Sequence, residues 1–274
     1  MKNLPEYLIE AVKPNSRQPN PERMSVTQLG DSPLIRTLWM ENWDKIEQDP
    51  EDMLWALYGT ALDTIVKAHN RTGLVDLKFE YPFDDYTIVG KPDIYYPSTE
   101  TLVDVKTTSV WTLQNPRKEW TYQLNVYKWL MEQLMPELKV KKLEVHGIGR
   151  DWRKNEKLRY NTYPDSAFVV INIPMWDDVG KVIDADIKRH KNFPREECTL
   201  EEKWSKPDQY AVMRTGRKSA LRVLDSEGDA HKWCKHNDHK VGANGIKIVK
   251  RPGEFVRCNH YCPVSSVCEY AKNL

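Results

Sequence analysis

The sequence predicts a mixed α/β (α+β) fold in which a mixed central sheet is flanked by helices. Residues 50–69 and 117–135 carry apolar side chains at helical spacing, whereas residues 74–109 alternate with a period of two and are rich in β-branched and aromatic residues. Two more strand-like segments, 140–152 and 167–174, precede a helical segment at 175–193. This order of helices and strands is typical of an α/β or α+β domain with a mixed sheet.

The composition indicates a globular protein with one main domain. The chain has 274 residues, 40% of them hydrophobic, which is enough for a sizeable core. Its 41 Lys and Arg balance 40 Asp and Glu, so any nucleic-acid partner must bind to local patches. The chain has no run of about 18 apolar residues, and its first residues lack the apolar core of a signal peptide. We expect a cytoplasmic protein with no membrane partner, located in the host cytoplasm if it is phage-encoded.

Changes in composition divide the chain into three parts. Residues 1–24 are predicted to be an N-terminal arm, because their second half is rich in proline, asparagine and charge. Residues 25–193 are predicted to be the core. Residues 194–274 are predicted to be a cysteine-rich segment of short, polar pieces, including a helix in which Thr199 and Glu202 form a capping box.

Local signals define the elements of the predicted core. A first helix is expected after Asp31 or Ser32, with Pro33 in its first turn. A second, well-buried helix is expected over 50–69, and residues 74–109 are expected to form a three-stranded antiparallel meander. The apolar positions of that second helix are Leu54, Leu57, Tyr58, Ala61, Leu62 and Ile65.

Two aspartates and a lysine surround the last turn of the predicted meander. Residues two apart in a strand point to the same face, so Asp104 and Lys106 project together, and a turn after Gly90 and Pro92 brings Asp93 beside Asp104. Two such carboxylates repel each other unless a cation lies between them, and Mg²⁺ is suited to this role. Lys106 would then orient an attacking water or stabilise charge on a phosphate. The alternative is an exposed turn with a surface salt bridge.

The helix predicted at 117–135 favours the metal-site interpretation. Its buried face consists of Trp120, Gln123, Leu124, Tyr127, Leu130, Met131 and Leu134. A glutamine within an apolar face needs hydrogen-bond partners. The chain shows "YGTALDTIV", "GKPD", "DVK" and "QLNVY" in this order. The series resembles the motifs of the PD-(D/E)XK nuclease superfamily, specifically its RecB-like branch, over roughly residues 25–190, and it implies a restriction-endonuclease-like core.

The resemblance also implies roles for individual residues. Asp93 and Asp104 would bind Mg²⁺ or Mn²⁺ together with the carbonyl of Val105, Lys106 would be the catalytic lysine, and Gln123 and Tyr127 would position the DNA phosphate or the lysine. Where the family often has a metal-binding histidine, this sequence has Asp63, a competent ligand for a hard metal. Two further residues are weaker candidates for the site, namely His69 as a substitute ligand and Glu80 as an outer supporting residue.

The cysteines predict a second metal site near the C-terminus. Cys258, Cys262 and Cys268 are closely spaced, and a tetrahedral site needs a fourth ligand, which could be Cys198, Cys234 or His260. The region is similar to phage-encoded RecB-like exonucleases, which implies a 4Fe-4S cluster and favours Cys198 over Cys234. Zn²⁺ is the alternative metal. The thiols could also be small buried residues without a metal.

Basic patches indicate where nucleic acid would bind. One patch spans residues 139–159, and two more lie in the C-terminal segment. Trp111, Trp120 and Trp152 are candidates for stacking on bases, although at least one is expected in the core. The basic residues of the C-terminal patches are Arg214, Arg217, Lys218, Arg222, Lys232, Lys235, Lys240, Lys247, Lys250 and Arg251.

The function expected from the motifs and the resemblance is that of a metal-dependent DNA exonuclease. It would hydrolyse phosphodiester bonds from DNA ends, on linear duplex or single strands, in phage-type recombination, replication or repair. The resemblance suggests a single-strand-annealing recombinase as a partner. The alternatives are a structure-specific endonuclease and a non-catalytic nucleic-acid-binding protein in which Asp63 marks a decayed site.

Overall fold

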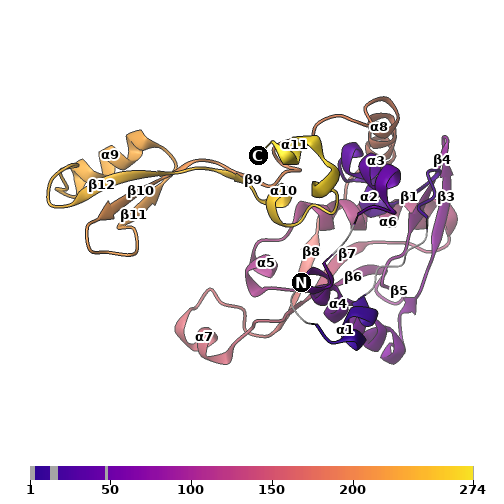
Figure 1. The fold of residues 1–274 in the computed structure, drawn as a ribbon. Helices are drawn as coiled ribbons and strands as arrows, with labels where there is room; N and C mark the ends of the chain where they lie inside the picture. Colours follow the sequence, from indigo (N-terminus) through magenta and orange to yellow (C-terminus); the bar gives the residue numbers. More distant parts are fainter. Residues whose placement is uncertain (1–3, 13–17, 47–48, 274) are drawn as a thin grey trace. The chain divides into compact units, whose positions relative to one another are not determined.

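The computed structural model describes residues 4–12, 18–46 and 49–273, which form two compact units, 1–195 and 196–274 (Figure 1). Residues 1–3 and 13–17 of the predicted N-terminal arm lie outside the described residues. The elements of the first unit are α1 (Glu6–Val12), β1 (Arg23–Ser25), α2 (Val26–Leu29), α3 (Pro33–Asn42), α4 (Pro50–His69), β2 (Leu74–Val75), β3 (Phe79–Phe83), β4 (Tyr86–Gly90), β5 (Ile94–Tyr96), β6 (Thr101–Thr108), α5 (Val110–Gln114), α6 (Lys118–Leu134), β7 (Lys142–Gly149), α7 (Lys154–Arg159), β8 (Phe168–Ile173) and α8 (Val179–Asn192).

A five-stranded mixed sheet is the centre of the first unit, as the sequence predicts. Its order is β2-β5-β6-β7-β8, and only the β6–β7 pair among these is parallel. The parallel pair requires a crossover connection, which α5 and α6 provide. The predicted mixed α/β fold is therefore confirmed.

The predicted three-stranded meander is wrong, because residues 74–109 form five strands in two sheets. β3 pairs with β4, and β1 joins β4 in parallel, in a separate three-stranded sheet. The chain leaves this sheet after Gly90 and enters the central sheet at Ile94. Pro92 lies at this break and lacks the backbone N–H that a continuous strand would need.

Helix α6 forms the centre of the hydrophobic core. Leu124, Leu130 and Met131 are fully buried and pack with Leu102 of β6 and Leu143 of β7. The predicted apolar face is confirmed except at Leu134, the last residue of the helix, which is 40% exposed. The buried face holds α6 against the same side of β6 from which Asp104 projects, since Leu102 and Asp104 are two residues apart.

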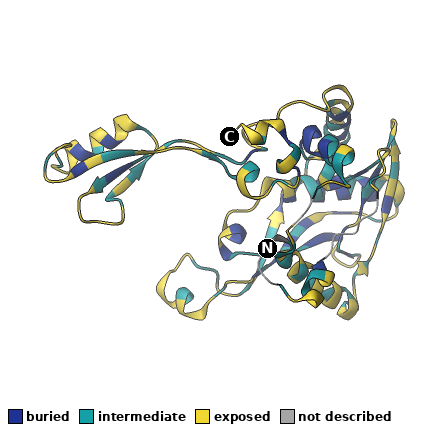
Figure 2. Cartoon of the chain, in the orientation of Figure 1, coloured by how far each residue is buried: buried dark blue, intermediate teal, exposed yellow. Residues whose placement is uncertain are grey.

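Helix α4 is present as predicted, but it is not well buried. None of its described side chains is fully buried (Figure 2), and Trp55, Tyr58 and Ile65 are 59%, 60% and 58% exposed. Its neighbours within the first unit are α1 and β6. The helical period thus predicts the element correctly but not its burial.

The second unit contains more regular structure than the sequence indicates. A three-stranded antiparallel sheet, β11-β10-β12, packs against α9 through Val212, Ala230, Cys234 and Ile246. Thr199 and Glu202 form the two hydrogen bonds of the predicted capping box, but around a turn and not a helix. The elements of this unit are β9 (Ser205–Lys206), β10 (Gln209–Arg214), β11 (Arg222–Leu224), α9 (Glu227–His236), β12 (Ile246–Arg251), β13 (Glu254–Phe255), α10 (Val256–His260), a 3₁₀ turn (Ser265–Val267) and α11 (Glu269–Lys272).

Within the described part of the chain, no helix has the length and apolar character needed to cross a bilayer.

Candidate active site

Asp93 is held in place by the turn that connects the two sheets. The backbone N–H of Val105 donates a 2.8 Å hydrogen bond to Asp93 Oδ2, which fixes the turn against β6. Gly90 allows α6 to approach the start of this turn, because a Cβ there would lie 2.8 Å from Leu130 Cδ1 and 3.0 Å from Tyr127 Cδ1. A larger residue at position 90 would push the turn away from α6.

Asp104 and Lys106 project together from β6 and form an ion pair. Lys106 Nζ lies 2.7 Å from Asp104 Oδ2, and the Asp104 side chain is only 4% exposed. Burial is the largest cause that raises the pKa of Asp104, to about 6; the charge of Lys106 opposes the shift, and the charge of Asp93 adds to it. Apart from the ammonium of Lys106, no donor among the described residues contacts the buried Asp104 Oδ2. The charge of this oxygen is therefore compensated mainly by Lys106.

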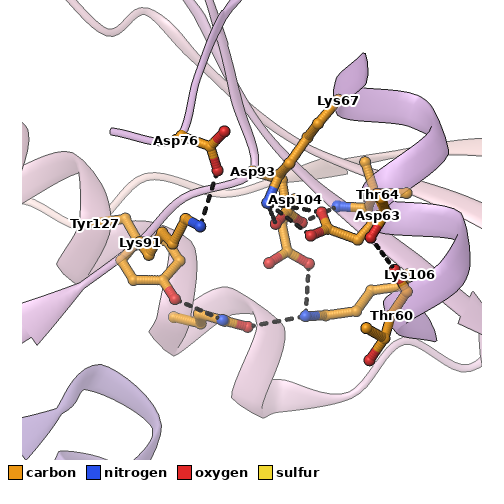
Figure 3. A network of polar contacts seen from close by, with 12 residues as sticks. Thr60, Asp63, Thr64, Lys67, Asp76, Lys91, Asp93, Asp104, Lys106 and Tyr127 are labelled. Atoms are coloured by element: carbon orange, nitrogen blue, oxygen red, sulfur yellow. Dashed lines mark hydrogen bonds and ion pairs between the residues drawn. The ribbon is translucent and has the colours of Figure 1, made fainter. Parts of the chain in front are cut away.

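Gln123 and Tyr127 of α6 continue this chain of contacts, and Figure 3 shows Lys106 and Tyr127 at its two ends. Lys106 Nζ donates to Gln123 Oε1 at 3.2 Å, and Gln123 Nε2 donates to Tyr127 Oη at 2.9 Å. Burial is the main cause of the raised pKa of Tyr127, so this hydroxyl stays neutral. The partly buried glutamine is thus satisfied at both ends of its amide, and it fixes the position of Lys106.

Asp63 reaches the site from α4, but through a lysine that the sequence analysis did not select. Lys67 Nζ lies 2.7 Å and 2.9 Å from the two carboxylate oxygens of Asp63 and 3.2 Å from Asp93 Oδ1 (Figure 3). Its side chain is 10% exposed. Burial lowers the pKa of Lys67, but the hydrogen bonds and charges of the two aspartates outweigh it and the net shift is upward, so the ammonium is charged. The four-residue spacing of Asp63 and Lys67 was a readable signal, because such pairs meet on a helix surface.

The weaker candidates lie in other environments. Glu80 binds Arg23 and Lys78, whose hydrogen bonds lower its pKa to about 2. The ring of His69 contacts the backbone carbonyl of Ile65. Among the tryptophans, Trp120 belongs to the core, Trp152 donates to the Pro164 carbonyl, and Trp111 is 70% exposed.

The donors at the junction of β4, β5 and β6 suit a hard divalent cation. Asp93 and Asp104 supply carboxylates, and the Val105 carbonyl belongs to the same stretch. The buried Asp104 Oδ2 has only Lys106 as a partner among the described residues and could accept a cation as a second one. Among the described residues, no three His, Cys, Asp or Glu side chains converge on one point. This agrees with the position of Asp63, whose two oxygens both face Lys67.

The cysteines of the second unit fall into two environments. Cys234 is 1% exposed in the small core beneath α9, where burial raises its pKa. Burial also raises the pKa of Cys262 to about 11, and the charges of Cys258 and Cys198 raise it further. Burial likewise raises the pKa of Cys258, and the charge of Cys268 adds to that shift. Cys262 therefore lies near Cys198 and Cys258, and Cys258 lies near Cys268. Among the described residues, however, no three of these thiols are placed so that they could hold a metal ion.

The mixed sheet flanked by helices is consistent with a nuclease fold. The sequence profile of the PD-(D/E)XK nuclease superfamily matches residues 27–269, and the chain belongs to this superfamily. Nucleic acid is therefore its class of substrate, and nucleases of this superfamily typically use a divalent metal ion. No curated protein sequence matches the chain.

Several solved structures are similar to this chain at low sequence identity. The crystal structure of SSO0001 has a TM-score of 0.50 and 15% identity, with 73% of this chain and 90% of that chain covered. A phage related exonuclease from Haemophilus somnus 129PT has a TM-score of 0.37 and 13% identity, with coverages of 59% and 79%. An alkaline exonuclease from Laribacter hongkongensis has a TM-score of 0.37 and 10% identity, with coverages of 69% and 94%. At these identities the similarity concerns the fold alone.

Proposed function

We propose that the chain is a metal-dependent DNA exonuclease of the RecB-like branch, similar to those that phages encode for recombination, replication or repair. The observation that carries the nuclease function is the continuous set of contacts from Asp104 through Lys106 and Gln123 to Tyr127, beside the anchored Asp93. The exonuclease mode follows from the resemblance of the motif series to that branch.

Mg²⁺ or Mn²⁺ would bind to Asp93, Asp104 and the Val105 carbonyl. Asp63 lies at the position where the family often has a further ligand, but both of its oxygens contact Lys67. When bound, the ion supplies positive charge that stabilises the phosphate in the transition state and lowers the pKa of the attacking water. The metal ion would also give the buried Asp104 Oδ2 a partner in addition to Lys106.

Lys106 would act on the scissile phosphate from the same face. Its ammonium is held between Asp104 and Gln123, so it can place a fixed positive charge where negative charge develops. Gln123 would position this lysine, and Tyr127 would hold the orientation of the glutamine amide. Each group is pre-organised by α6, which lowers the cost of ordering the site during the reaction.

The sheet and helix formed by residues 209–251 would contribute to DNA binding. All ten of their Lys and Arg side chains are exposed, and they outnumber the four acids Asp225, Glu227, Asp229 and Asp238. Contacts of such side chains with phosphates release counterions, so binding weakens as salt rises. Replacement of Arg214, Arg217 and Lys218 by glutamine should lower DNA affinity and flatten its dependence on salt in an anisotropy titration.

The decisive experiment compares linear and closed DNA. Linear duplex and single-stranded substrates, labelled at one end at a time, are incubated with the protein and Mg²⁺ or Mn²⁺, and the products are sized. We expect mononucleotides or short oligonucleotides released from ends, and no cleavage of covalently closed circles. Cleavage of closed circles would instead identify a structure-specific endonuclease, and degradation without added metal would contradict the proposed mechanism.

A single-strand-annealing recombinase is the partner we propose, and it should raise the yield of annealed products from resected ends.

We further propose that Cys198, Cys258, Cys262 and Cys268 hold a 4Fe-4S cluster that stabilises the second unit. The electrostatic influence of Cys198 and Cys258 on Cys262, and of Cys268 on Cys258, supports this set, whereas Cys234 packs among apolar side chains of α9 and its sheet. Anaerobically purified protein should contain iron and sulfide and should be brown. Cys198→Ser should lower the iron content and Cys234→Ser should not. Colourless protein with stoichiometric zinc would identify a zinc site instead.

A further inference from the structure

Lys67 is a second ammonium group within the candidate active site, and no motif assigns it a role. Its Nζ lies within 3.2 Å of three carboxylate oxygens from two separate elements, both oxygens of Asp63 on α4 and Oδ1 of Asp93 on the turn before β5. The side chain is 10% exposed and lies on the same side of α4 as Asp63, one helical turn further along. A largely buried lysine that joins two carboxylates in this way occupies the place of a bridging cation.

The charges of the site are balanced when Lys67 is included. Asp63, Asp93 and Asp104 carry three negative charges when ionised, against the two positive charges of Lys67 and Lys106. One divalent ion and one DNA phosphate would bring this set to neutrality. A second divalent ion would have to bind within a few ångströms of the Lys67 ammonium. The two cations would repel each other strongly there, because burial lowers the effective dielectric constant.

The contacts of the individual carboxylate oxygens also leave room for one metal ion beside Lys67. Both oxygens of Asp63 face Lys67, and Asp93 Oδ2 accepts the hydrogen bond from Val105 N. Asp93 Oδ1 has the longest of the Lys67 contacts, at 3.2 Å, and Asp104 forms its ion pair with Lys106. A metal ion can therefore reach Asp93 and Asp104 while Lys67 remains on Asp63.

We propose that Lys67 is a built-in cation that takes the place of a second metal ion, so that the site binds a single divalent ion at Asp93 and Asp104. Asp63 then acts as a positioning residue, which holds Lys67 and is not itself a metal ligand. The inference rests on the proposed metal-dependent function, and it specifies how many ions that site uses.

Metal stoichiometry tests this inference without an activity assay. Metal-free protein is titrated with Mn²⁺ in the absence of DNA, and binding is followed by calorimetry and by the electron paramagnetic resonance signal of free and bound Mn²⁺. We expect one ion per chain in the unaltered protein. In Lys67→Met the two aspartates lose their cation, so a second ion should bind and produce the signal of a coupled Mn²⁺ pair.

Two variants serve as matched controls. Lys91 lies on the turn that carries Asp93, and its Nζ pairs with Asp76 at 2.8 Å. Lys91→Met therefore removes the same charge as Lys67→Met from a nearby position, and it should leave the stoichiometry at one Mn²⁺ per chain. Asp63→Asn combined with Lys67→Met removes the additional carboxylate and should return the count from two to one. Circular dichroism and thermal unfolding establish that each variant is folded before it is titrated.

Two results would overturn the inference. The first is the binding of two Mn²⁺ ions by the unaltered protein, which counts even if Lys67→Met does not fold. The second is a folded Lys67→Met variant that still binds only one Mn²⁺ ion. The proposed function is tested separately by the DNA assay. A protein that binds one Mn²⁺ as expected but degrades no DNA would refute the nuclease proposal and leave the role of Lys67 intact.

Discussion

Helices α4 and α6 both flank the candidate site, and the same helical spacing of apolar residues predicts both of them. They nevertheless hold their polar side chains in different ways. On α6, Gln123 lies between Trp120 and Leu124 of a buried face and is fixed by the core around it. On α4, with Tyr58 and Ile65 about three-fifths exposed, Asp63 and Lys67 fix each other through an ion pair one turn apart. One side of the site is therefore positioned by packing and the other by charge.

This difference predicts which substitutions the site will tolerate. Residues of α6 serve stability and positioning together, so their loss affects both. Residues on the site-facing side of α4 compensate one another, so a single change there exposes an unpaired charge and leaves the fold largely intact. The following changes test this division, from the largest expected effect to the smallest.

Lys106→Ala should have the largest effect on activity. The substitution removes the ammonium group that Asp104 and Gln123 hold in place. Loss of a pre-organised charge at a developing negative charge costs about 10²–10³ in rate. The initial rate of release from end-labelled DNA measures it, and wild-type rates in a pure Lys106→Ala preparation would refute the assigned role.

Leu124→Ala should destabilise the first unit by about 2–5 kcal/mol, because the side chain is fully buried and its loss leaves a cavity. Ile65→Ala on α4 is the comparison, and we expect a change of about 0.5 kcal/mol or less because its side chain is 58% exposed. Chemical denaturation of both variants in the same buffer measures the two free energies. Equal destabilisation would mean that the exposed stripe of α4 is covered in solution.

Asp104 should make the metal-free protein more stable at mildly acidic pH than at neutral pH. Its folded-state pKa of about 6 lies above the ordinary 3.8, so the folded state binds the proton more tightly, and this stabilisation is lost as pH rises through 6. The expected loss between about pH 5 and pH 7 is about 1 kcal/mol. Denaturation in the presence of a chelator at both pH values measures it, and Asp104→Asn should remove this part of the difference.

Tyr127→Phe should have the smallest effect. It removes the hydroxyl that accepts a hydrogen bond from Gln123 and keeps the buried ring. The net contribution of one such hydrogen bond is about 1 kcal/mol, so we expect a decrease of about fivefold in kcat. The free energy of unfolding should also fall by about 1 kcal/mol, because Tyr127 lies on α6. A loss of activity as large as that of Lys106→Ala would mean that the hydroxyl contacts the substrate directly.

Much of the α6 side of the site could be predicted from the sequence. The spacing of Asp104 and Lys106 on a strand, and of Gln123 and Tyr127 on a helix, fixes which residues share a face, because these distances are local. Lys67 was missed, since its role depends on Asp93, which lies far away in the sequence and meets α4 only in the folded chain.

The pairing of strands and the burial of helices were less predictable, because they too depend on contacts between residues that are distant in the sequence. Residues 74–109 have the pattern of strands in either arrangement, and only the change of sheet at Pro92 separates two sheets from one meander. The second unit contains few long apolar runs, so the small core around Val212 and Cys234 forms from residues that are distant in the sequence.

The short connection from Gly90 to Asp93 has a consequence for protein engineering. It joins two different sheets while its last residue is fixed to β6 by the Val105 N–H and its first lies against α6. Most surface loops accept inserted residues at small energetic cost, but here one extra residue would move a carboxylate out of register with its backbone anchor. Chimeras between nucleases of this superfamily should therefore exchange β4, the connection and β5 as one block, with α6 taken from the same parent.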